Sequence, residues 1–112
     1  MTASFIEGKK IGTISDANVT NLVDTPPSGT RRIVKTITIA NNDGVPNIVT
    51  ISVISGTTSI LWQGQLDGGD TWCFGDGGEI IVVDSNTSVV IQLSGVPSTP
   101  LSFMSAYGDA TT

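Results

Sequence analysis

Histidine is absent from this sequence of 112 residues, and cysteine occurs once, at Cys73. Without histidine, neither a Ser/His/Asp triad nor a Cys/His pair can form, and one cysteine cannot make an intramolecular disulfide. Within Trp72-Cys73-Phe74 we expect the thiol to be a small buried apolar group rather than a nucleophile. No stretch suggests a reaction, so we expect no enzyme, no catalytic residue and no cofactor.

Charge is also scarce, at 13% of residues, and its two signs are separated along the chain. All five bases lie at or before Lys35, whereas residues 36–112 hold seven acids and no base. A nucleic-acid binder needs a basic surface to displace counterions, so nucleic acid is not an expected partner. The asymmetry would also suit head-to-tail contact between neighbours, although solvated surface charge is the simpler explanation.

Long apolar runs are missing as well. None approaches the 18 residues of a membrane-spanning helix, and MTASFIEGKK lacks the apolar core of a signal peptide, so no membrane is expected. What is abundant is Ser, Thr, Gly, Val and Ile, a composition that favours strands and turns. The length predicts a single domain, and the composition predicts an all-β fold.

The clearest pattern lies in residues 31–53, where two runs alternate between apolar and polar residues. Ile33, Ile37 and Ile39 mark the first run, and Val49 to Val53 repeats the alternation. Between them, Asn41-Asn42-Asp43-Gly44 supplies residues that tolerate a positive φ angle, and Pro46 interrupts pairing. This pattern predicts an antiparallel pair joined by a loop.

Further strands are predicted over residues 19–24, 59–66, 71–74, 80–83, 87–93 and 101–107, with turn residues between them. The continuous apolar run Ile80 to Val83 predicts a strand covered on both faces or buried against a neighbour. The spacing indicates a single β-sandwich of about eight antiparallel strands, jelly-roll-like, over residues 19–112.

Residues 1–18 are polar and weakly patterned, and we expect an extended N-terminal arm. It could be a frayed terminus or an arm laid along another subunit. The candidate partner contacts are its apolar and basic residues together with the basic pair that opens the first alternating run: Phe5, Ile6, Lys9, Lys10, Ile11, Arg31 and Arg32.

The acidic residues and the aromatic residues each suggest a further kind of site. The acids Asp67, Asp70, Asp76 and Glu79 could suggest paired catalytic carboxylates or a calcium repeat, but they lie in Gly-rich segments where hairpin turns are required, so no metal is expected.

The aromatic residues Trp62, Trp72, Phe74 and Tyr107 could form a carbohydrate platform. Trp62, however, shares a face with Ile60 and Leu66, which is the spacing of a core.

A resemblance rests on the turn Pro27-Ser28-Gly29-Thr30 before the strand that ends at Asn41, and on the later Gly56-Thr57-Thr58 and Leu66-Asp67-Gly68-Gly69-Asp70. Over residues 20–107 the chain resembles small virion proteins of tailed bacteriophages, closest to capsid decoration, or cement, proteins. It departs from them in the turn at residues 76–79 and in its long polar N-terminal segment.

The resemblance implies a structural virion protein that binds the outside of an assembled capsid and bridges neighbouring shell subunits. Its partners would be the major capsid protein and further copies of itself, as a trimer. The protein would be made in the host cytoplasm and reside on the capsid surface. Related modules in tails and fibres leave an alternative, a carbohydrate- or receptor-binding β-sandwich.

Overall fold

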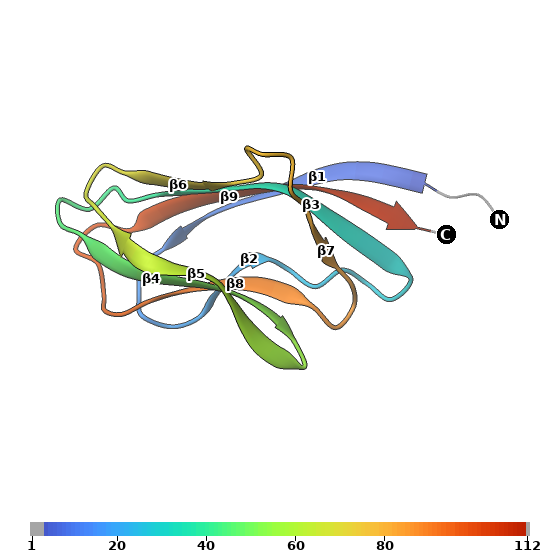
Figure 1. The fold of residues 1–112 in the computed structure, drawn as a ribbon, viewed down its shortest axis with the longest axis horizontal. Coiled ribbons are helices and arrows are strands. Elements are labelled where there is room, and N and C mark those ends of the chain that lie inside the picture. Colours follow the sequence, from blue (N-terminus) through green and yellow to red (C-terminus); the bar gives the residue numbers. More distant parts are fainter. Residues whose placement is uncertain (1–3, 112) are drawn as a thin grey trace.

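The computed structural model describes residues 4–111, which form nine β-strands and no helix (Figure 1). No helix that could cross a membrane therefore occurs in this part of the chain. The strands are β1 (Ser4–Ile14), β2 (Thr20–Val23), β3 (Thr30–Ala40), β4 (Asn47–Ser55), β5 (Thr57–Leu66), β6 (Thr71–Phe74), β7 (Ile81–Val83), β8 (Ser88–Leu93) and β9 (Leu101–Thr111).

The strands form two stacked antiparallel sheets. The large sheet has the order β1-β9-β3, with β6 and β7 sharing the far side of β3, and the small sheet has the order β2-β8-β4-β5. Figure 1 shows the two sheets one above the other, with the tip of the β4–β5 hairpin projecting from the body. Most consecutive strands lie in different sheets, as in a jelly roll, and the exceptions are the pairs β4 and β5 in the small sheet and β6 and β7 in the large sheet. The predicted all-β sandwich is confirmed.

The core lies between the sheets and contains only aliphatic residues and one phenylalanine. Alternation along each strand delivers one face to this interior. The fully buried positions include Ile37 and Ile39 on β3, as their spacing predicts, and Val49 and Ile51 on β4. Their partners from other strands include Ile14, Leu22, Val89, Ile91, Leu101 and Phe103.

The predicted antiparallel pairing of β3 with β4 is wrong. β3 pairs with β9, β6 and β7, whereas β4 pairs with β5 and β8, so the two strands belong to opposite sheets. The loop between them crosses the sandwich: the Asn41 amide donates to the carbonyl of Leu66 at 2.8 Å, and the Asp43 carboxylate accepts from the Ser98 N–H at 3.1 Å. No residue from Asn41 to Gly44 adopts a positive φ angle. Alternation gives each strand a buried face but does not choose its partner.

The expectation that Ile80–Val83 is covered on both faces is also wrong. β7 pairs only with β3, at the edge of the large sheet, and Val82 is 50% exposed. Ile81 and Val83 point to the interior and Val82 points away from it. A run of four apolar residues cannot by itself distinguish a covered strand from an edge strand.

The N-terminal segment predicted as an arm is, from Ser4 to Ile14, a strand paired with β9 along its whole length. Ile14 is fully buried in the core. Gly8 and Gly12 leave room for two aromatic side chains of β9, because the rings of Tyr107 and Phe103 lie where a Cβ atom would project. The segment is thus the edge of the large sheet, while residues 1–3 of the predicted arm lie outside the described residues.

Candidate interaction surface

The register of β1 against β9 divides the candidate contact residues between two faces. Phe103 is buried in the core and lies opposite Gly12, so even-numbered residues of β1 share the inner side of the sheet. Phe5, Lys9 and Ile11 therefore project from the outer face of the large sheet, the face turned away from the small sheet.

The middle of this outer face is built from small side chains. Along β9 it carries the small residues Ser102, Ala106, Gly108 and Ala110 together with the larger Met104, and all five lie opposite odd-numbered residues of β1. The Phe5 ring lies over Gly108, where a methyl group would collide with it, and Lys35 Nζ lies 5.1 Å from the centroid of that ring. A smooth sheet surface flanked by larger apolar side chains results.

Ile11 is the most prominent apolar residue of this face, with 65% of its surface exposed. It borders an open depression of about 240 Å³ that Thr38, Ala40 and Met104 also line. A second open depression, of about 390 Å³, lies between Glu7, Lys9 and Ala106. Both are open surface hollows, and neither encloses a volume in which a small substrate would be buried.

Arg31 lies toward the opposite end of β3, where an open depression of about 550 Å³ includes it together with Asp84. The backbone N–H of Asn86 donates to Asp84 and lowers the pKa of that carboxyl below its usual value, so Asp84 carries its charge. Arg31 and Lys9 form no ion pair with any described residue. Their charges are the ones available to a partner.

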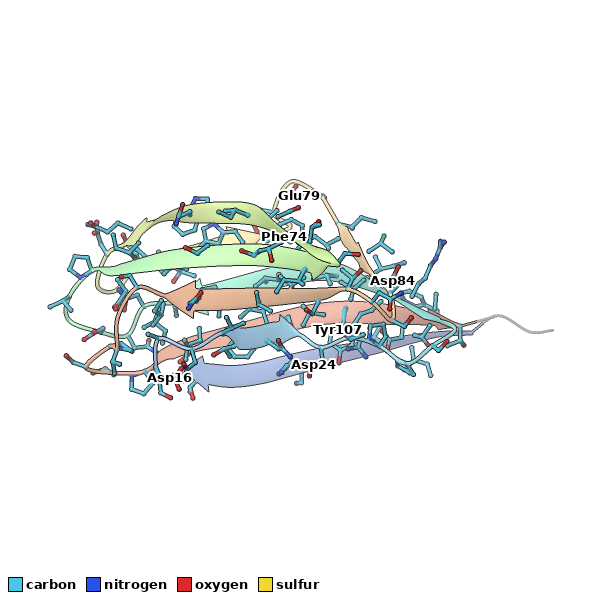
Figure 2. All side chains as sticks on the ribbon, turned by 90° about the horizontal axis from the view of Figure 1, so that it is seen from below. Asp16, Asp24, Phe74, Glu79, Asp84 and Tyr107 are labelled. Carbon is cyan, nitrogen blue, oxygen red and sulfur yellow. The ribbon has the colours of Figure 1, made fainter. Side chains whose placement is uncertain are left out.

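Lys10 and Arg32, by contrast, are engaged within the chain on the inner side. Lys10 Nζ lies 2.9 and 3.0 Å from the two carboxylate oxygens of Asp24, and this hydrogen bond lowers the pKa of Asp24. Asp24 and Tyr107, which both contact Arg32, are labelled in Figure 2. Ile6 lies on the same side but is largely exposed.

Arg32 makes the more enclosed of these contacts. Its guanidinium donates to both oxygens of Asp109 and, through Nη1, to the carbonyl of Asp24 at 2.8 Å. It also lies 4.2 Å from the centroid of the Tyr107 ring. The hydrogen bond to Asp109 raises the pKa of Arg32 further. Lys10 and Arg32 are therefore structural residues in this chain, and the sequence could not separate them from Lys9 and Arg31 without the register.

Cys73 also lies on the outer face, so the expectation that it is buried is wrong. It is exposed in β6 because Trp72 and Phe74, on either side of it, take the inward positions. Through the pairing of β6 with β3 and of β3 with β9, Cys73 stands in one cross-strand row with Thr38, Met104 and Ile11.

The aromatic residues do not form a platform for sugar. Trp62 and Trp72 lie against each other, with ring centroids 5.8 Å apart, and both pack on the core together with Phe74. Tyr107 lies beneath Arg32. Ile60 does not share the inward face of Trp62 and Leu66 as predicted, because β5 has a bulge at Leu61 that turns Ile60 outward.

The acidic turns form no metal site among the described residues, since nowhere in residues 4–111 do three potential ligands gather. Glycines with positive φ angles at Gly69, Gly75 and Gly78 shape these turns. The Glu79 carboxylate accepts from the N–H of Gly75 at 3.4 Å, and Figure 2 shows Glu79 on an outer loop, far from Asp16.

Sequence reasoning missed the β9 half of this face. The signal was present in residues 102–110, where four of the five even-numbered positions carry small residues, namely Ser102, Ala106, Gly108 and Ala110. Small residues at every second position predict a strand whose outer face is flat. Without the pairing of β1 and β9, that face could not be joined to Phe5, Lys9 and Ile11.

No family model and no curated protein matches the sequence. Among solved structures, the fold is similar to that of a chain in the acid-stable capsid of Helicobacter pylori bacteriophage KHP30, with a TM-score of 0.60, 15% identity, and coverage of 96% of this chain and 92% of that one. It is also similar to a chain of the disulfide-linked pili that form Bacillus endospore appendages, with a TM-score of 0.56, 15% identity, and coverage of 98% and 88%. At this identity the likeness shows a shared fold.

Proposed function

We propose that this chain is a structural protein of a bacteriophage particle that binds the outside of the assembled capsid and bridges neighbouring shell subunits. The observation that carries the proposal is the outer face of the large sheet: small residues of β9 in the middle, with exposed Phe5, Ile11 and Met104 around them. The same role is supported by the similarity of the fold to a chain from a phage capsid structure, because the similarity covers almost the full length of both chains.

The proposed mechanism is stabilisation by mass action. A protein that binds only the assembled lattice raises the free energy needed to disrupt it, and many copies act in parallel. The outer face would supply buried apolar area, and Lys9 and Arg31 would meet carboxylates of the major capsid protein at its margins. No catalytic step belongs to this proposal. The resemblance in sequence adds the expectation that three copies associate on the particle surface.

The first test is the copy number of the chain in purified particles, measured by quantitative mass spectrometry against the major shell protein. Abundance comparable to that of the shell protein is expected of a lattice component. A few copies per particle would contradict the capsid location and favour a tail or fibre module with a receptor or sugar ligand. Absence from the particle would overturn the virion role.

The docking face can be tested with the single native thiol. Because Cys73 lies on the outer face, a maleimide should modify it readily in the free protein and not in the particle-bound protein. A matched variant, Cys73→Ser with Gln92→Cys on the small sheet, should stay reactive in both states. Equal reactivity of Cys73 in both states would remove the outer face from the interface.

Two matched substitutions test how much the outer face contributes to the affinity for the particle. Ile11→Asp should weaken particle binding about tenfold or more, since it places an unpaired charge in an apolar contact. Ile48→Asp, a similarly exposed isoleucine on the small sheet, should bind normally. Deletion of residues 1–18 is unsuitable as a test, because it removes β1 and with it Ile14 from the core.

A further inference from the structure

The small sheet carries no charge on any of its strands: β2, β4, β5 and β8 contain no Asp, Glu, Lys or Arg. β5 forms its outer edge, ten residues long, and pairs only with β4. Its free side therefore offers unpaired backbone N–H and C=O groups along an uncharged strand without proline. Soluble proteins normally protect such an edge with charge, proline or covering segments, because it invites pairing with another strand.

The other sheet edges formed by residues 4–111 have the usual protection. β1 carries Glu7, Lys9 and Lys10. The opposite edge of the large sheet is divided into the short strands β6 and β7, and β2 is four residues long with a bulge. β5 thus differs from every other described edge in combining length with the absence of charge.

β5 has one interruption, a bulge at Leu61. Trp62 lies opposite Ile51, and Ile60 lies opposite the next residue of β4, Ser52, so Leu61 is the extra residue. Trp62 packs on the core, whereas Ile60 is 59% exposed on the outer side of the small sheet. Because Leu61 is an extra residue, the alternation of inward and outward side chains shifts by one position across the bulge. A partner strand without a bulge could therefore align its inward and outward side chains with β5 on only one side of Leu61.

A second β5 matches both sides. In an antiparallel pair about a twofold axis, with Leu61 opposite the partner copy's residue 62, Ile60 stands opposite the second Gln63 and Thr58 opposite the second Gln65. All of these residues face the outer side, so the two bulges coincide at the axis and both flanks stay in register.

We propose that the β5 edge pairs with the β5 edge of a second copy of this chain, joining two small sheets into one continuous sheet. Pairing of two β5 edges buries no charged residue, whereas pairing with a β1 edge would bring Lys9 and Lys10 toward a contact that offers no acid. The twofold contact is closed, so it joins copies in pairs and leaves no free β5 edge. It uses a different surface from the face proposed to bind the capsid.

The test is the mass of the full chain in solution with reductant present, by sedimentation or light scattering over a wide concentration range. The wild type should show an even number of chains, and Ile60→Lys should halve that mass and weaken the association about tenfold or more, since it puts like charges close to the axis. Thr58→Lys should act in the same direction. Hydrogen exchange of residues 57–66 should be slower in the wild type than in either variant.

Ile48→Lys is the matched control. Ile48 is 47% exposed on the same outer side, but it belongs to β4, whose two edges are both occupied, so its substitution should leave the mass unchanged. A monomeric wild type at every concentration, an odd-numbered assembly that Ile60→Lys leaves intact, or an equal effect of Ile48→Lys would each overturn the proposal. Particle binding by a strictly monomeric protein would leave the capsid role standing while removing this contact.

Discussion

Arg32 and Asp109 face each other across β3 and β9 and form a two-point ion pair, with Nε and Nη2 of the guanidinium 2.8 and 3.0 Å from the two carboxylate oxygens. The pair is mostly shielded from water, with 12% and 23% of the side chains exposed. It joins the two central strands of the large sheet, β9 and β3, close to Asp24, the residue that follows β2.

Arg32→Lys should lower the free energy of unfolding by about 1–3 kcal/mol, because an ammonium group cannot reproduce the paired hydrogen bonds or the stacking on Tyr107. Urea denaturation measures the change. Arg31→Lys is the control on the neighbouring exposed residue and should shift stability by less than about 0.5 kcal/mol. Equal midpoints for the two variants would contradict a structural role for Arg32.

The Lys10–Asp24 pair should make stability depend on acid pH. Lys10 lowers the pKa of Asp24 in the folded protein, so the contribution is present above the unfolded pKa of about 3.9 and is lost as pH falls through the lower folded pKa. Lys10→Met should therefore cost about 0.2–1 kcal/mol near neutrality, a small value because the pair is partly exposed, and almost nothing in strong acid.

Lys9→Met gives the control for that experiment, because Lys9 projects from the other face of β1 and forms no ion pair with a described residue. Denaturation curves across the acid range should show a pH-dependent gap between wild type and Lys10→Met and none for Lys9→Met. If the difference in unfolding free energy between wild type and Lys10→Met grew as the pH fell, the predicted direction of the pH dependence would be wrong.

Gly75→Ala should destabilise the fold by about 2 kcal/mol or more. Gly75 has a φ angle of +100°, and an added Cβ atom would collide with the backbone carbonyl of Lys35, which cannot move without disturbing β3. Gly44→Ala provides the comparison, since its Cβ would meet nothing and its φ angle is not positive. Thermal unfolding of both variants distinguishes a required glycine from a tolerated one.

Trp72→Ala should cost about 2–4 kcal/mol, because the indole packs on Trp62 and on the core. Met104→Ala, which truncates a large apolar side chain that is exposed, should cost far less. Unfolding free energies from denaturant titration test the pair. A stable Trp72→Ala protein that has lost binding to a sugar would instead restore the carbohydrate interpretation.

Local patterns in the sequence were sufficient for the sandwich and for eight of the nine strands, but β1 was predicted as an extended arm. The spacing of Ile37 and Ile39 predicted the buried face of β3, but Ile33 does not share that face, because a bulge between Val34 and Thr36 sends Val34 to the core instead. The regular turns predicted about eight strands, and residues 4–111 form nine. Strand pairing was not accessible, because the alternation of β3 fits β4 and β9 equally well and only the packing of the whole chain decides.

The candidate surface was predicted in part for the same reason. Lys9 and Lys10 are neighbours of identical type in the sequence, yet the register sends one to the outer face and the other to Asp24. Cys73 was predicted as buried because its neighbours are aromatic, although these neighbours are what turn it outward. Positions such as these depend on contacts between residues far apart along the chain.

The central position of β9 has a consequence for synthesis. Because β9 lies between β1 and β3, these two strands do not pair with each other. The large sheet therefore cannot form until residues 101–111 have left the ribosome. Up to that moment the apolar sides of β1 and β3 are without the strand that joins them. Folding of the large sheet must therefore wait for the strand of this domain that is synthesised last, however early β1 and β3 are made.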